Sequence, residues 1–164
     1  MKRITLSILA LCQLCLVFAQ WGPQSRVESI TVPSKVLEPD RTETSPRHVA
    51  ATIYLPKSYE AEPDRKYPVL YLLHGMSDTD KAWFWRGHAG EVADQLIASG
   101  EAVEMIIVSP NAGGSFDDNH WNGYFDMPGW KYDTFFYTEF LPHIESTYRI
   151  IGDKAHRAVA GLTM

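Results

Sequence analysis

Residues 67–75 have the sequence Tyr-Pro-Val-Leu-Tyr-Leu-Leu-His-Gly, which contains the most informative apolar run of the chain. The five residues from Val69 to Leu73 show no alternation between apolar and polar side chains. A strand with this pattern is covered on both faces, which is typical of a central strand in a parallel sheet. The sequence therefore predicts a buried strand over 69–73 that ends at His74-Gly75.

Segments on both sides of this strand extend the pattern. Runs of β-forming or small apolar residues predict further strands over 27–32, 49–55, 103–110 and 157–161. Helical spacing predicts one helix over 91–99 that ends at Gly100, and another that begins at an N-cap Asp133 and is kinked by Pro142. Strand, helix, strand, helix, strand in this order predicts an α/β protein with parallel, right-handed βαβ units.

The first nineteen residues are predicted to be a secretory signal peptide. Lys2 and Arg3 precede an apolar run from Ile4 to Phe18, and a cleavage site after Ala19 fits the small-residue rule. A membrane anchor is disfavoured because spanning a bilayer takes about 20 apolar residues. We therefore expect a secreted or periplasmic protein without a membrane segment after cleavage.

Composition excludes several classes of protein. The 164 residues carry 15 Lys+Arg against 20 Asp+Glu, and without Lys2 and Arg3 the balance is 13 against 20, a net charge of −7. No basic run is present, so a nucleic-acid partner is not expected. Both cysteines, Cys12 and Cys15, lie in the predicted signal peptide, which leaves neither a disulfide framework nor a cysteine metal site in the mature chain.

Two strand ends carry residues that could take part in a reaction. Reacting groups in open α/β sheets gather beyond the carboxyl ends of the strands, so the ends at His74-Gly75-Met76 and Gly161-Leu162-Thr163-Met164 are expected to be neighbours. The second segment fits the first four positions of the G-x-S-x-G nucleophile elbow, with Thr163 in place of serine. Four residues alone are a weak signal.

Four motifs in unbroken order make the signal more specific. They are residues 67–75, 105–111 (Met-Ile-Ile-Val-Ser-Pro-Asn), 141–149 with Leu-Pro-His-Ile-Glu and Tyr-Arg, and 156–164 (His-Arg-Ala-Val-Ala-Gly-Leu-Thr-Met). Over about residues 49–164 the chain resembles the secreted esterases that include feruloyl and acetylxylan esterases, which are related to esterase D and the mycolyltransferases. The resemblance implies an α/β-hydrolase fold, represented by its N-terminal portion up to the nucleophile elbow.

The resemblance also implies roles for individual residues. Thr163 stands at the nucleophile position, and the backbone N–H groups of Met76 and Met164 match the oxyanion hole. His74 matches a supporting histidine, not a base. The acid and histidine of the triad follow the nucleophile in this fold, so we expect them beyond residue 164 and expect the chain to be C-terminally truncated. No cofactor or metal is implied.

Residues 111–131 form a long loop rich in glycine and aromatic residues. Trp121, Tyr124 and Trp130 are candidates for lining a substrate cleft, and packing of the loop onto the sheet is an equally good interpretation. Asp118 and His120 resemble the start of a calcium loop, but Gly129 stands where the bidentate glutamate belongs, which argues against metal binding.

Together these observations predict three segments: a signal peptide (1–19), an N-terminal extension with a first strand (20–46), and a partial esterase domain (47–164). The expected function is a secreted carboxylic ester hydrolase that acts through an acyl-enzyme on acylated polysaccharide or oligosaccharide. Because Thr163 replaces the usual serine, a non-catalytic carbohydrate-binding relative is the alternative, and a mycolyl-type transferase is a weaker third.

Overall fold

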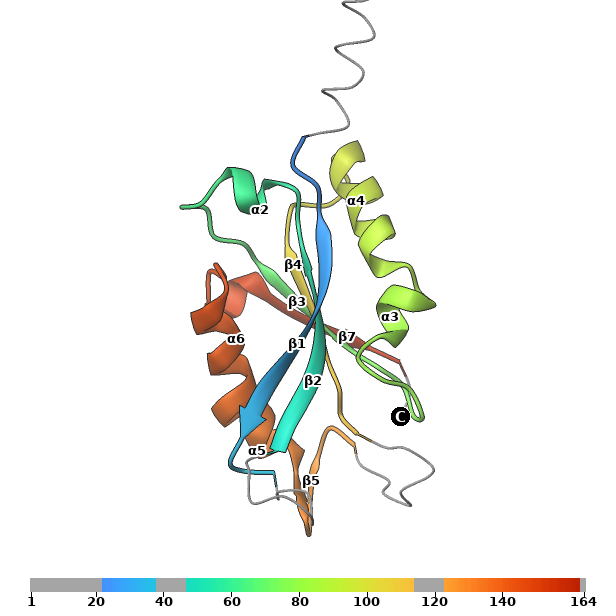
Figure 1. Cartoon of the computed structure of the whole chain (residues 1–164), viewed down its shortest axis with the longest axis vertical. Coiled ribbons are helices and arrows are strands. Elements are labelled where there is room, and N and C mark those ends of the chain that lie inside the picture. The colour runs from blue at the N-terminus through green and yellow to red at the C-terminus, as the bar shows by residue number, and fades with distance from the viewer. Residues whose placement is uncertain (1–21, 38–46, 114–122, 163–164) are drawn as a thin grey trace, which may run out of the picture.

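A computed structural model describes residues 22–37, 47–113 and 123–162. Within these residues, helices lie on both faces of a five-stranded sheet (Figure 1). The strands are β1 (Arg26–Ser34), β2 (Arg47–Leu55), β3 (Val69–Leu73), β4 (Ile106–Pro110) and β7 (Arg157–Gly161), with a small hairpin of β5 (Asp126–Met127) and β6 (Trp130–Lys131). The helices are α2 (Ser58–Ala61), α3 (Ala82–Trp85), α4 (Ala89–Ser99), α5 (Tyr132–Phe135), the π-helical η2 (Phe136–Phe140), α6 (Leu141–Thr147) and the 3₁₀ turn η3 (Lys154–His156).

The strand order is β1-β2-β4-β3-β7. β1 pairs with β2 and β2 with β4 in antiparallel fashion, whereas β3 is parallel to both β4 and β7. The segment containing α3 and α4 connects β3 to β4, and the segment from α5 to α6 connects β4 to β7. The predicted parallel βαβ units are confirmed.

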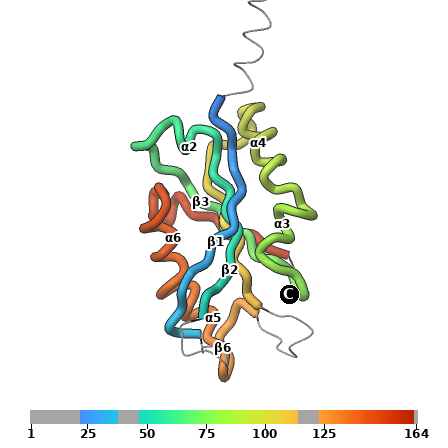
Figure 2. Tube along the Cα trace, viewed as in Figure 1, coloured from blue at the N-terminus to red at the C-terminus, as the bar shows by residue number. Residues whose placement is uncertain are grey.

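Each face of β3 belongs to a separate apolar cluster, as its uninterrupted apolar sequence predicts. Val69 and Tyr71 face the larger cluster, which includes Phe136, Phe140 and Ile144 of the α5–α6 segment. The alternate residues Leu70 and Leu72 face the cluster under α4. The two layers of helices therefore lie on opposite sides of the sheet (Figure 2).

Helix α4 ends as predicted. Gly100 has a φ of 77°, in the left-handed region, and the N–H of Glu101 donates to the carbonyl of Leu96 at 2.9 Å. Glycine adopts this conformation without the steric cost that a side chain imposes.

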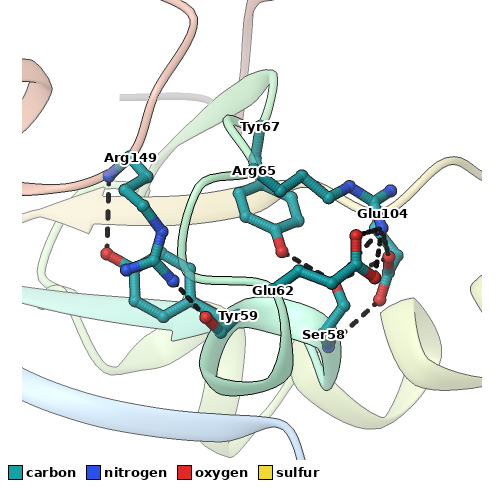
Figure 3. Close-up of polar contacts among 7 residues, drawn as sticks. All are labelled: Ser58, Tyr59, Glu62, Arg65, Tyr67, Glu104 and Arg149. Atoms are coloured by element: carbon teal, nitrogen blue, oxygen red, sulfur yellow. Dashed lines mark hydrogen bonds and ion pairs between the residues drawn. The ribbon is translucent and has the colours of Figure 1, made fainter.

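Strand β4 begins later than expected, at Ile106 instead of residue 103. Glu104, two residues before the strand, instead contacts the β2–β3 connection: its carboxylate accepts the Ser58 hydroxyl at 2.8 Å and pairs with Arg65 at 2.6 Å. Ser58 also contacts the Tyr67 hydroxyl at 2.7 Å (Figure 3). These contacts secure the β2–β3 connection at the amino ends of the parallel strands.

A second cluster at the same end holds Arg149. Its guanidinium lies 3.7 Å from the centroid of the Tyr59 ring and donates to the Tyr59 carbonyl (Figure 3). The Tyr67 N–H donates to the Arg149 carbonyl at 2.9 Å. The chain just after α6 is thereby joined to the chain just before β3, and the opposite, carboxyl ends of the strands remain for the site.

The start of the helical segment from 132 differs from the prediction. Its N-cap is Lys131 and not Asp133, which lies in the first turn. The capping contacts come from Asp126 in the neighbouring hairpin, whose carboxylate accepts the N–H of Thr134 at 3.1 Å and its hydroxyl at 2.5 Å. A carboxylate from outside the helix thus satisfies a donor of the first turn. Near Pro142 the irregularity takes the form of the π-helical η2, which directly precedes the proline-containing α6.

The Asp126 contacts predict a pH effect on stability. The pKa of Asp126 is lowered from the usual 3.8 chiefly by the hydrogen bond from the Thr134 side chain, then by that from its N–H. A lowered pKa in the folded state stabilises the protein above pH 3.8, and this contribution is lost as the pH falls through the folded-state pKa. We expect Asp126→Asn to lower the free energy of unfolding at pH 7, and the difference from wild type to shrink at pH 3. Urea unfolding at both values tests this, and an equal difference at both would contradict it.

Candidate active site

The two strand ends singled out in the sequence lie side by side. In the parallel pair β3–β7, Leu73 is the register partner of Gly161, and the N–H of Leu162 donates to the Leu73 carbonyl at 3.2 Å. The turn after β3 and the segment after β7 therefore leave the same edge of the sheet together. The expectation that they are neighbours is confirmed as far as Leu162, and Thr163 and Met164 lie outside the described residues.

Gly161 permits this close approach. A Cβ atom placed on it would lie 3.1 Å from both the Cβ and the carbonyl oxygen of Leu73. Such contacts are closer than side chains normally tolerate, so the strands meet here because this position has no side chain.

The Leu73 carbonyl also accepts a hydrogen bond from the indole N–H of Trp83 in α3 at 3.0 Å. One acceptor thus holds both the segment that follows β7 and the helix that follows the β3 turn. The sequence slightly favours packing over substrate contact for Trp83, and its indole has a packing and anchoring role here.

The turn after β3 presents the amide expected in the oxyanion hole. The Asp78 N–H donates to the Gly75 carbonyl at 3.2 Å, and Ser77 at the third position has a φ of 65°. Arg86 pairs with Asp78 at 2.7 Å and holds the end of the turn. Met76 is 48% exposed, and in the described part of the chain its N–H makes no hydrogen bond. This amide is therefore available to an oxyanion.

His74 is fully buried and both of its ring nitrogens are engaged. Nε2 accepts the N–H of Ala112 at 3.0 Å, so the proton of the neutral ring lies on Nδ1, which donates to the Gly75 carbonyl at 2.8 Å. The interaction joins the segment after β4 to the turn after β3. This arrangement fits the supporting role that the resemblance implies and leaves His74 no free nitrogen for proton transfer.

Two tyrosines secure the loop beyond β4 to the same edge. The Tyr124 hydroxyl donates to the His74 carbonyl at 3.3 Å, and the Tyr132 hydroxyl donates to the Asn111 carbonyl at 2.9 Å. Burial raises the pKa of both phenols, well above the usual 10 in Tyr132. They therefore remain protonated hydrogen-bond donors throughout the physiological range.

The candidate substrate-contact residues occupy different environments. Trp130 is only 6% exposed, stacks on Tyr132 and donates its indole N–H to the Gly123 carbonyl at 2.9 Å. Tyr124 is half-buried beside His74, with the ring centroids 5.5 Å apart. These positions favour packing for Trp130 and leave Tyr124 the better candidate for substrate contact. Trp121, Thr163, Met164 and the calcium-like residues Asp118 and His120 lie outside the described residues.

Sequence reasoning missed a buried carboxylate close to this edge. Asp80 is 3% exposed, and the Thr52 hydroxyl donates to it at 2.6 Å. Thr52 is the register partner of Ser109, whose hydroxyl is buried without a hydrogen-bond partner in the described part of the protein. The available signal was the occurrence of two hydroxyl residues in otherwise apolar strands, since buried polar groups normally require a partner.

The residues that the structure describes contain no group of three His, Cys, Asp or Glu side chains placed to hold a metal ion. In the same residues, no helix has the length and apolar character needed to cross a bilayer.

Comparison with known proteins now identifies the family. The model of the family described as "Putative esterase" matches residues 42–164. A solved ferulic acid esterase is 59% identical, with a TM-score of 0.80 over 88% of this chain and 50% of its own. A CE1 ferulic acid esterase from Anaeromyces mucronatus, solved in complex with ferulic acid, is 25% identical, with a TM-score of 0.66 over 85% of this chain and 49% of its own.

The curated relatives include an endo-1,4-beta-xylanase/feruloyl esterase of Xylanibacter ruminicola. It is 31% identical over 126 residues, which make up 75% of this chain and 17% of that protein. The chain thus spans about half the length of the solved relatives and a smaller part of this curated one.

These matches define the α/β-hydrolase fold, as the family resemblance implied. The chain belongs to the "Putative esterase" family.

Proposed function

We propose that the protein carrying this chain is a secreted carboxylic ester hydrolase that removes feruloyl or acetyl groups from plant polysaccharides. The observation that supports the proposal is the pairing of Leu73 with Gly161, which places the end of β7 beside the turn that carries Met76; the proposed nucleophile Thr163 follows two residues later in the sequence. Membership of the family and 59% identity to a ferulic acid esterase support the reaction class and the acyl group.

The proposed reaction proceeds through an acyl-enzyme. The Thr163 hydroxyl attacks the ester carbonyl carbon, and the N–H groups of Met76 and Met164 stabilise the resulting oxyanion, each contributing about 3 kcal/mol. The bond to the alcohol oxygen breaks, the alcohol leaves with a proton, and the acyl group stays on Thr163. Water then attacks the acyl carbonyl and releases the acid.

The general base is proposed to lie beyond residue 164, together with its partner carboxylate. His74 is unsuited to this role because its Nε2 accepts the Ala112 N–H and its Nδ1 donates to Gly75. Residues 1–19 are proposed to direct export, residues 20–46 to form an extension with the first strand, and residues 47–164 to be the N-terminal part of the catalytic domain.

Hydrolysis of methyl ferulate by the full-length protein tests the proposal. We expect Thr163→Ala to reduce turnover by several orders of magnitude, because it removes the nucleophile and leaves only the residual rate that the oxyanion hole and substrate binding supply. A fluorophosphonate probe should label the wild type at Thr163. Turnover by the wild type no faster than by Thr163→Ala would contradict the proposal, and sugar binding without labelling would favour the non-catalytic alternative.

A further inference from the structure

We infer that a groove beside α3 and α4, separate from the strand ends described above, binds the neutral main chain of a xylan-type polysaccharide. The groove has a volume of about 460 Å³ and is lined by residues of β1, β2, α3 and α4 and the segments beside them. Figure 1 shows α3 and α4 on one face of the sheet. Its lining includes Ser25, Ser29, Tyr54, Phe84, Trp85 and Asp94. The inference rests on the proposed function only for the identity of the polymer.

Trp85 at the rim supplies an aromatic platform. Its side chain is 80% exposed, and in the described part of the protein its indole makes no ring contact or hydrogen bond. Tryptophan is a highly buried residue on average, so an indole without packing partners beside a groove indicates a contact surface. The flat ring suits the apolar C–H face of a pyranose, with the sugar hydroxyls directed to the sides.

The floor of the groove holds polar groups in fixed positions. The Ser25 hydroxyl donates to one oxygen of Asp94 at 2.6 Å, and the Tyr54 hydroxyl donates to the other at 2.9 Å. Burial is the main cause of a raised pKa in Tyr54, so its hydroxyl keeps its proton at neutral pH. Both hydroxyl oxygens retain lone pairs that can accept hydrogen bonds from sugar hydroxyls.

Charge in and around the groove favours a neutral ligand. Arg26, which also lines it, is paired with Glu28 and Glu60, and the carboxylates of Glu91 and Asp94 face the same space as Lys81. No excess of cationic groups is available for an anionic polymer. A volume of this size lies within the range of about 300–1,000 Å³ for small-ligand sites, which is sufficient for a short stretch of a sugar chain.

The position of the groove relates it to the candidate active site. Lys81, Phe84 and Trp85 form one wall, and they belong to the segment that starts directly after the Gly75–Asp78 turn. On the floor, Thr52 donates to Asp80 in the same segment. A polymer held in the groove would therefore be retained close to the segment that carries the Met76 amide.

Calorimetric titration of the full-length protein with unsubstituted xylohexaose tests the inference. This sugar has no ester, so its binding is measured independently of hydrolysis. We expect Trp85→Ala to weaken binding about tenfold, which corresponds to about 1.4 kcal/mol, and Trp85→Phe to restore part of the affinity. Tyr137→Ala, which removes a ring that is 63% exposed in η2 and not part of the groove, is the matched control and should bind as the wild type does.

Kinetics separate this groove from the ester site. Trp85→Ala should leave kcat/KM for methyl ferulate unchanged and should lower the rate of ferulate release from feruloylated arabinoxylan. Absence of saturable binding by the wild type, or equal affinity in Trp85→Ala, would overturn the inference. The inference would also be overturned if the wild type were a dimer and Trp85→Ala dissociated that dimer without a change in sugar binding. If the protein binds the sugar but does not cleave methyl ferulate, the groove inference stands and the proposed esterase function is contradicted.

Discussion

Gly161→Val is expected to destabilise the protein by about 3 kcal/mol and to abolish ester hydrolysis. Any Cβ atom at this position meets the Cβ and carbonyl oxygen of Leu73 at 3.1 Å, and the two γ-methyl groups of valine add further volume. Overpacking of this kind costs about 1–3 kcal/mol. The displaced strand would also lose the hydrogen bond from the Leu162 N–H to Leu73, and Leu162 directly precedes the proposed nucleophile Thr163 in the sequence.

The start of β7 is held independently, which makes the local effect measurable. Arg157 pairs with Glu145 of α6 at 2.5 and 2.6 Å, so the strand remains attached at that end when its carboxyl end is displaced. The melting temperature and the methyl ferulate turnover of the full-length protein should both decrease in the order wild type, Gly161→Ala, Gly161→Val. Gly22→Ala is the matched control, because a Cβ atom there meets nothing within 4 Å. A Gly161→Val protein with wild-type melting temperature and activity would show that the strand pairing does not position the site.

The sheet could be predicted because hydrophobic periodicity is a local property. The continuous apolar run of β3 and the glycine after α4 each express their structure within a few residues, and both are confirmed. The paired strand ends followed from a general rule about parallel sheets, not from any residue contact.

The contacts that determine the finer structure join residues distant in sequence, so they left no local signal. Asp126 replaces Asp133 as the capping residue of the α5 segment because the β5–β6 hairpin brings it to Thr134. Glu104 lies outside the strand that was predicted to include it and pairs with Ser58 and Arg65, about forty residues earlier. Local propensity cannot anticipate such partners.

In the candidate site, too, some features could be predicted from the sequence, whereas contacts between residues distant in sequence could not. The resemblance placed His74 in a supporting role, and the structure gives that role a geometry: one nitrogen contacts the β4 loop and the other contacts the β3 turn. Asp80 and Thr52 were missed because each residue looks ordinary until the fold buries them together. The bulky aromatic Trp130 suggested a substrate contact in the sequence, but its stacking on Tyr132 accounts for it as well.

Substitution of His74 is expected to separate the structural contribution of this residue from its effect on the turn. His74→Leu removes both ring contacts and leaves the buried N–H of Ala112 without an acceptor, which costs about 1–3 kcal/mol. It also removes one of the two donors to the Gly75 carbonyl, whose peptide unit carries the Met76 N–H, and leaves only the Asp78 N–H to hold it. We expect a lower free energy of urea unfolding together with a fall in kcat, since the removal of one oxyanion donor costs about 10²–10³-fold.

Two conservative replacements distinguish the contacts. The amide of His74→Asn reaches the position of Nδ1 and can donate to Gly75, whereas the longer His74→Gln reaches toward Nε2 and can accept from Ala112. We expect Asn to retain more of the kcat and Gln to retain more of the stability, with the pH dependence of kcat/KM unchanged in both. Loss of an acid limb from the pH profile in the Asn variant would instead assign His74 a proton-transfer role. That outcome would contradict the assignment of both nitrogens, because a ring that donates at Nδ1 and accepts at Nε2 within the protein has no nitrogen left to exchange a proton with a substrate.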